Sequence, residues 1–146
     1  MPPSVCAQTL RTKLLSCLGM LMALTFAALV GQAAHAAPGP ALTTLLTKEL
    51  GDLPGKELLA ITVEYPPGGA DPVHRHDAHV FVYVLEGAVV MGLKGGKEVT
   101  LTGGQTFYEG PGDVHTVSRN ASSTMPAKFL VVFVKNKGPE AVLPAR

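Results

Sequence analysis

The sequence of 146 residues has no tryptophan, few other aromatic residues and little charge. Charged residues make up 16% of the chain and the formal net charge is only +1, whereas hydrophobic residues make up 47%. A disordered chain needs low hydrophobicity together with high net charge, so this composition excludes disorder. Proteins that bind nucleic acid usually present a basic face, so we expect no nucleic acid among the partners.

Cysteine and charge are both absent from long stretches of the chain. The two cysteines, Cys6 and Cys17, lie within the first 17 residues, and no Lys, Arg, Asp or Glu occurs between Leu14 and Thr47. The rest of the chain can therefore form no disulfide and use no thiol as nucleophile or metal ligand.

The uncharged stretch has the features of an export signal. Two basic residues, Arg11 and Lys13, precede a 17-residue run without charge, and the sequence Ala34-His35-Ala36 fits a small-x-small cleavage site. We predict a signal peptide over residues 1–36 with cleavage after Ala36, which leaves a periplasmic or secreted protein with no stable membrane insertion. The alternative is an uncleaved anchor, for which 17 residues are at the lower limit of a bilayer span.

After residue 36 the pattern predicts an all-β protein. Glycine and proline turns recur between short apolar segments, which favours a sandwich or closed barrel. The predicted strands cover residues 58–65, 80–85, 88–94, 97–102, 105–109, 114–118 and 128–135.

Two features of this pattern concern the core and the domain boundaries. The continuous run at residues 80–85 predicts a strand buried on both faces, with its aromatic residues Phe81 and Tyr83 in the core. The residues before the first predicted strand suit either an extended arm or a short helix. We therefore divide the chain into an arm (37–56), a barrel domain (57–135) and a C-terminal tail (136–146).

Four histidines carry the chemistry expected of this domain. His74 and His76 point to the same face if they lie on a strand, His79 follows closely, and His115 comes after a glycine-proline turn. Neutral imidazole is the commonest nitrogen ligand of transition metals. A pair of surface histidines is the alternative, but His115 on a facing strand would complete a three-histidine metal site.

The histidines lie within two spaced patterns, 68–87 and 104–115. In the first, a glycine is followed after five residues by His-Arg-His and later by Gly87; in the second, a glycine is followed after five residues by Gly-Pro-Gly and then by His115. Sixteen residues separate the two patterns. They resemble the two motifs of the cupin superfamily, in the arrangement typical of small single-domain bacterial cupins, and the resemblance covers about residues 57–135.

The resemblance implies a jelly-roll barrel of six to eight antiparallel strands with one divalent transition metal inside, which could be iron, manganese, zinc, nickel or copper. We expect a metalloenzyme with oxygenase-like or isomerase-like activity, and because three neutral histidine ligands leave the charge of the metal uncompensated, we expect a small, anionic substrate. The alternative is a non-catalytic periplasmic module that binds a metal or small ligand, or acts as a sensor. Because exposed β-edges favour pairing, a homodimer is an open option.

The chain departs from the family pattern at three positions. Val80 occupies the position of the glutamate ligand in the first motif, while Gly110 and Arg119 occupy the proline and asparagine positions of the second. We therefore consider His79 as a replacement ligand, because a β-bulge before it could turn it inward. The alternative for His79 is a place at the rim of the site.

Two residues before the turn of the second pattern, Tyr108 and Glu109, are candidates for catalysis. Successive residues of a strand point to opposite faces, so one of the two should face the cavity. That residue could act as a general acid or base, or support a metal ligand. The alternative is an outward side chain with a structural role only.

Overall fold

A computed structural model of the protein describes residues 39–145, in which the chain forms ten β-strands and no helix. This part of the chain therefore contains no helix that could cross a membrane. The strands are β1 (Ala41–Glu49), β2 (Lys56–Tyr65), β3 (His74–Arg75), β4 (Ala78–Glu86), β5 (Ala88–Leu93), β6 (Val99–Thr102), β7 (Thr106–Glu109), β8 (Val114–Asn120), β9 (Ala127–Asn136) and β10 (Leu143–Pro144).

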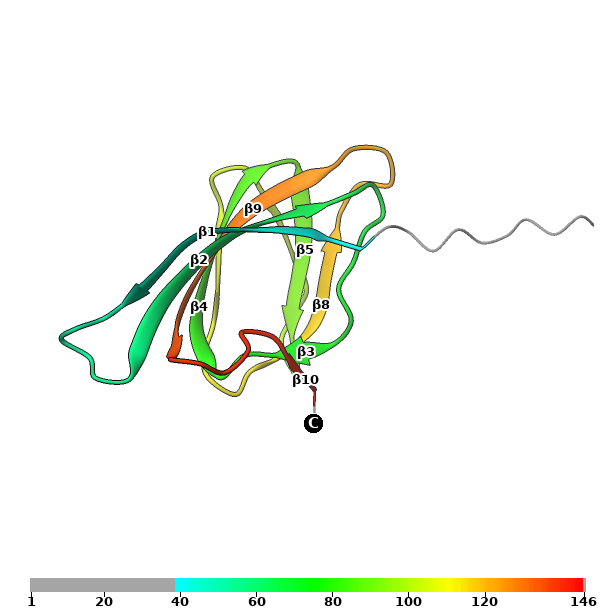
Figure 1. Ribbon diagram of the computed structural model, residues 1–146. Coiled ribbons are helices and arrows are strands. Elements are labelled where there is room, and N and C mark those ends of the chain that lie inside the picture. The colour runs from blue at the N-terminus through cyan, green and yellow to red at the C-terminus, as the bar shows by residue number, and fades with distance from the viewer. Residues whose placement is uncertain (1–38, 146) are drawn as a thin grey trace, which may run out of the picture. The chain divides into compact units, whose positions relative to one another are not determined.

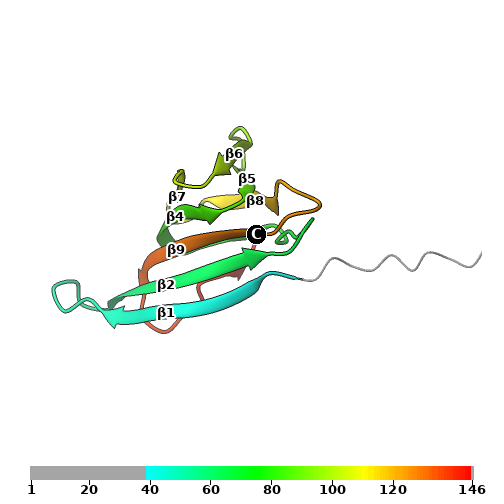
Figure 2. The same ribbon diagram turned by 90° about the horizontal axis from the view of Figure 1, so that it is seen from above.

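The strands form two five-stranded antiparallel sheets. One sheet has the order β1-β2-β9-β4-β7 and the other β10-β3-β8-β5-β6. Figures 1 and 2 show the two sheets facing each other as the walls of a barrel. The predicted all-β jelly-roll barrel of antiparallel strands is confirmed, with β1 and the short strands β3 and β10 as additions to the strands expected from the sequence.

The core lies between the sheets and follows the two-residue period of the strands. β4 alternates strictly, with Val80, Val82 and Val84 at most 1% exposed. Each such apolar side chain contributes about 1.5–3 kcal/mol through burial. The largest fully buried apolar side chains are Tyr65, Phe133 and Met91.

The prediction that both faces of residues 80–85 are buried is wrong. Phe81 and Tyr83 are 45% and 37% exposed, because they point to the outer face of the sheet. Within residues 39–145 no further layer covers that face. An uninterrupted apolar sequence therefore indicated the strand correctly but not the number of faces that it buries.

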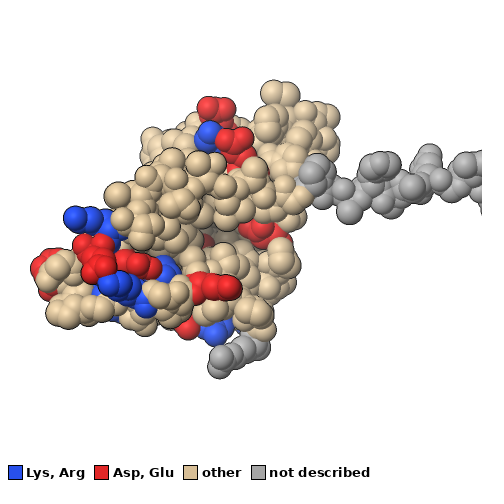
Figure 3. Space-filling view, in the orientation of Figure 1, with Lys and Arg blue, Asp and Glu red and all other residues tan. Residues whose placement is uncertain are grey.

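The two ends of the described chain both join the sheets. Residues 41–49, for which the sequence left an arm or a helix open, form β1 and pair with β2 in a long hairpin that extends past the barrel (Figure 2). Charged side chains gather over the far end of this hairpin (Figure 3). The segment expected as a C-terminal tail contains β10, which pairs with β3.

Candidate metal centre

Three histidines of the two sequence patterns meet on the inner wall of the barrel. His74 on β3 lies directly opposite His115 on β8, so the two side chains share one face of the sheet. His76 lies two residues beyond His74 and turns to the same side. His115 is therefore on the neighbouring strand of the same sheet and not on a facing strand.

The three rings are close together and shielded from solvent. The ring centroid of His74 lies 4.8 Å from that of His76 and 5.0 Å from that of His115. One nitrogen from each ring lies within 4.8 Å of the other two, which brings three candidate ligands of one metal ion together. The exposed fractions of the three residues are only 3–6%.

Backbone carbonyls orient two of the rings. Nδ1 of His74 lies 2.8 Å from the carbonyl oxygen of Pro72, and Nδ1 of His76 lies 2.6 Å from that of Ala141. Because a carbonyl only accepts, each Nδ1 donates its proton, and Nε2 of a neutral ring keeps a lone pair for a metal. Burial lowers the pKa of His76, which favours this neutral form.

His115 and Glu109 hold polar atoms that nothing in the described chain satisfies. Both ring nitrogens of His115 and Oε2 of Glu109 are buried without a hydrogen-bond partner. The remaining carboxylate oxygen, Oε1, lies 3.2 Å from Nδ1 of His115. Buried polar atoms are rarely left unpaired, and these donor atoms are of the type that binds a divalent transition metal. The residues present therefore fit a bound ion.

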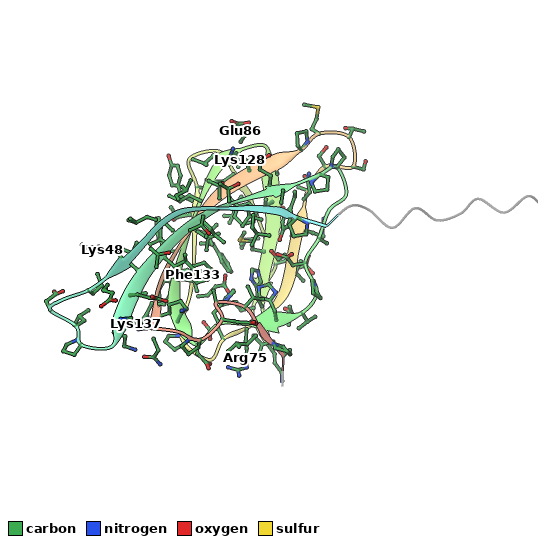
Figure 4. The ribbon with its side chains drawn as sticks, viewed as in Figure 1. Lys48, Arg75, Glu86, Lys128, Phe133 and Lys137 are labelled. Carbon is green, nitrogen blue, oxygen red and sulfur yellow. The ribbon has the colours of Figure 1, made fainter. Side chains whose placement is uncertain are left out.

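A cavity of about 230 Å³ opens in front of these histidines. Its walls are mainly apolar and come from both sheets. In Figure 4, Phe133 lies inside the barrel, whereas Arg75 lies at the lower end of the barrel. No lysine or arginine is among the lining residues, and the charged groups that reach the cavity are Asp71 and Glu109. The apolar side chains in the wall include Ile61, Val63, Val82, Met91, Phe129, Val131 and Phe133.

A second polar cluster, of which Asp71 and Ser118 line the cavity, was not predicted from the sequence. The Tyr65 hydroxyl lies 2.5 Å from Oδ2 of Asp71 and 2.6 Å from Oγ of Ser118. Burial, together with the bond to Asp71, raises the pKa of Tyr65, so the hydroxyl stays protonated and donates to the carboxylate. Tyr65 and Asp71 lie close in the sequence, but Ser118 is 53 residues from Tyr65, so no local spacing links all three residues. The carbonyl of Ala141 was missed for the same reason.

Two of the predicted site residues lie elsewhere. His79 and Tyr108 both point to the outer face of their sheet, where Nδ1 of His79 lies 2.6 Å from the Tyr108 hydroxyl. The bulge that would turn His79 inward does not occur, because β4 pairs regularly with β9 at this position. Of the pair before the turn, Glu109 is the one that faces the cavity and is 2% exposed.

Comparison with known families identifies the fold family of this chain. The family model described as "Cupin domain" matches residues 61–133 of this chain. The matched segment contains the three clustered histidines and the Glu109 carboxylate. No curated protein matches the sequence.

Solved structures share the fold at low sequence identity. A cupin domain from Bordetella pertussis Tohama I is 24% identical with a TM-score of 0.54, covering 68% of this chain and 97% of that one. The polyketide cyclase RemF from Streptomyces resistomycificus is 22% identical with a TM-score of 0.56, covering 73% of this chain and 71% of that one. The DMSP lyase DddQ from Ruegeria pomeroyi is 21% identical with a TM-score of 0.58, covering 80% of this chain and 56% of that one.

Proposed function

Because this chain belongs to the cupin family, we propose that it binds one divalent transition metal through His74, His76 and His115 and acts on a small molecule in the adjoining cavity. The observation that carries the proposal is the set of buried ring nitrogens. Two rings are oriented by backbone carbonyls, and the third has no hydrogen-bond partner among the described residues. A metal ion would accept a lone pair from one ring nitrogen of each of the three histidines.

The cavity favours a ligand whose larger part is apolar. Its walls are built mainly from aliphatic and aromatic side chains, and its lining includes no basic residue. The anionic group expected from the sequence would therefore find its positive partner in the metal ion. We propose a small substrate with an apolar body and one ionisable donor group.

The reaction class rests on the site and on the fold. A bound metal would supply Lewis-acid or oxygen-activating chemistry, so an oxygenase-like or isomerase-like reaction suits this site. The histidines would hold the ion, and the apolar walls would exclude water from it. A polyketide cyclase and a DMSP lyase have the same fold, although one fold can support many functions.

A non-catalytic binding or sensor module is the second candidate. Tyr108 lies outside the cavity, and the Asp71 carboxylate is already bonded to Tyr65. Glu109 is then the one carboxylate beside the histidines in the described chain. Such a small set of acid–base groups favours binding over proton-transfer catalysis.

Elemental analysis of the protein isolated from its native compartment tests the metal proposal. We expect about one transition metal ion per chain, as one three-histidine site should hold. Dialysis against a chelator should remove the ion and lower the melting temperature, because a ligand that binds only the folded state stabilises it. Protein that contains no metal, even after supplementation, would contradict the proposal.

The same preparation separates an enzyme from a binding module. The iron form is tested for oxygen uptake with small thiols, diketones and phenolic acids, and for thermal stabilisation by each compound. Turnover that stops when the metal is removed supports an enzyme. Stabilisation by a ligand without turnover supports the binding module.

Export and dimerisation are further parts of the proposal. The proposed export signal covers residues 1–36, which lie outside the described residues. β1 is an edge strand whose nine residues are all exposed, among them Leu42, Leu45 and Leu46, and we propose that it pairs with the same strand of a second copy. Native mass spectrometry of a periplasmic extract should find a chain that begins at Ala37 and twice its mass for the assembly. A chain that retains residues 1–36 argues against export, and a monomer argues against pairing.

A further inference from the structure

Glu109 is a buried carboxylate whose nearest basic groups in the described chain are histidine rings, not a lysine or arginine. It ends β7 and is 2% exposed, and the described chain forms no ion pair between it and a lysine or arginine. An ionised carboxylate in such a place is strongly destabilising unless a cation or a proton compensates it. Glu109 therefore needs either a bound proton or a positively charged partner in the cavity.

The carboxylate oxygens point toward the histidines. Oε1 lies 3.2 Å from Nδ1 of His115, and Oε2 lies 3.7 Å from Nε2 of His76. Nε2 of His76 is the nitrogen left free for a metal, because Nδ1 donates to the carbonyl of Ala141. Oε2 has no hydrogen-bond partner. One oxygen thus lies beside a candidate metal ligand with its lone pairs unused, although the group of ligand atoms within 4.8 Å of one another contains the three histidines and not Glu109.

The neighbouring strand shows why a carboxylate at this position can reach the site. Glu109 on β7 is the direct partner of Val80 on β4, and both side chains are buried on the inner face. Side chains paired across two strands lie about 4.5–5.5 Å apart at Cβ. Val80 is also the position at which this chain lacks the glutamate of the first motif. A carboxylate on β7 therefore lies one strand away from that position, on the same wall.

We propose that Glu109 is the fourth, anionic ligand of the ion held by the three histidines. This inference rests on the proposed metal site and specifies its ligand set. With Glu109 bound, the ligand set carries one negative charge and includes at least one oxygen atom beside the three imidazole nitrogens. Part of the charge of the ion is then neutralised by the protein.

A positioning role for Glu109 is the competing explanation. In that case Oε1 only accepts the Nδ1 proton of His115 and fixes the orientation of the ring. The amide oxygen of a glutamine can also accept a proton from Nδ1, so under this explanation Glu109→Gln should retain most of the metal affinity. As a ligand, a neutral amide is a poor substitute for a carboxylate.

The test measures Co²⁺ and Zn²⁺ affinity of the purified chain by calorimetry and chelator competition at pH 7. We expect the Glu109→Gln variant to bind these metals about 100-fold more weakly or worse. Loss of a residue that only supports a metal ligand typically weakens metal binding by roughly 10–100-fold. Glu64→Gln, which changes an exposed carboxylate on the outer face of β2, is the control and should bind like the parent.

A double variant returns the carboxylate to the neighbouring strand. Val80→Glu combined with Glu109→Val should regain an affinity within about tenfold of the parent (about 1.4 kcal/mol) and restore the parental Co²⁺ absorption spectrum. A loss below 100-fold in Glu109→Gln, or a double variant as weak as Glu109→Val alone, overturns the inference. If the parent itself binds no metal, the proposed function fails. If the parent and Glu109→Gln bind metal equally, the proposed function stands and only the role of Glu109 as a ligand fails.

Discussion

His115→Ala is expected to abolish metal binding at micromolar concentrations. His115 lies opposite His74 on the neighbouring strand, and both of its ring nitrogens lack a hydrogen-bond partner in the described chain. Alanine removes one of the three nitrogen ligands. The affinity for the metal should therefore fall by more than the roughly 10–100-fold that is typical when a residue supporting a ligand is lost. Calorimetric titration with Zn²⁺ of the metal-free protein measures the change.

His79→Ala is the matched control for this experiment. The change in side chain is the same, but His79 lies exposed on the outer face of its sheet, bonded to Tyr108. The control should bind Zn²⁺ as tightly as the parent chain. Equal binding by the two variants would show that the metal, if any, is held somewhere other than the histidine cluster.

Gly87→Ala is expected to destabilise the fold strongly, although it adds only one methyl group. Gly87 has a φ of 71°, and a Cβ atom there would lie 2.6 Å from the carbonyl oxygen of Pro126 and 2.9 Å from Cα of Ala127. The left-handed backbone costs an alanine about 1–2 kcal/mol, and overpacking adds about 1–3 kcal/mol. A loss of about 2–5 kcal/mol is a large share of the roughly 5–15 kcal/mol by which a typical domain is stable.

Gly95→Ala separates the two causes. Gly95 has a φ of 81°, but nothing lies within 4 Å of the position of its Cβ, so only the backbone term applies. Urea unfolding of the metal-free forms, followed by circular dichroism, should give a clearly larger loss for Gly87→Ala. If both variants lose the same free energy, the close approach of Pro126 does not contribute. Gly87 ends the first of the two sequence patterns, and this contact gives a physical reason for glycine there.

The strands could be predicted from the sequence because their cause is local. Turn residues and alternating apolar side chains act over a few positions, and every predicted strand has a counterpart in the structure within two residues at each end. Burial of Phe81 and Tyr83 was predicted wrongly, because it depends on whether a second layer covers the outer face. No periodicity within one strand contains that information.

The site was predicted in part for a related reason. His74, His76 and His115 lie at spacings that the family pattern preserves, so their approach in space could be expected. His79 could not be placed, because only the regular pairing of β4 with β9 excludes the bulge that would turn it inward. The hydrogen bond from His76 to the carbonyl of Ala141 joins segments that lie 65 residues apart in the sequence, so it could not be predicted either.

Sequence by itself determined the all-β character of this protein, its short strands and the three histidines that form the candidate site. These properties follow from side-chain chemistry and from spacing along the chain. Only the tertiary structure decided which face of each strand is buried, that Glu109 lies beside the histidines whereas Tyr108 lies outside, and that the C-terminal segment orients His76. Those properties arise from pairing between distant strands, because register and sheet order bring together groups that no local pattern connects.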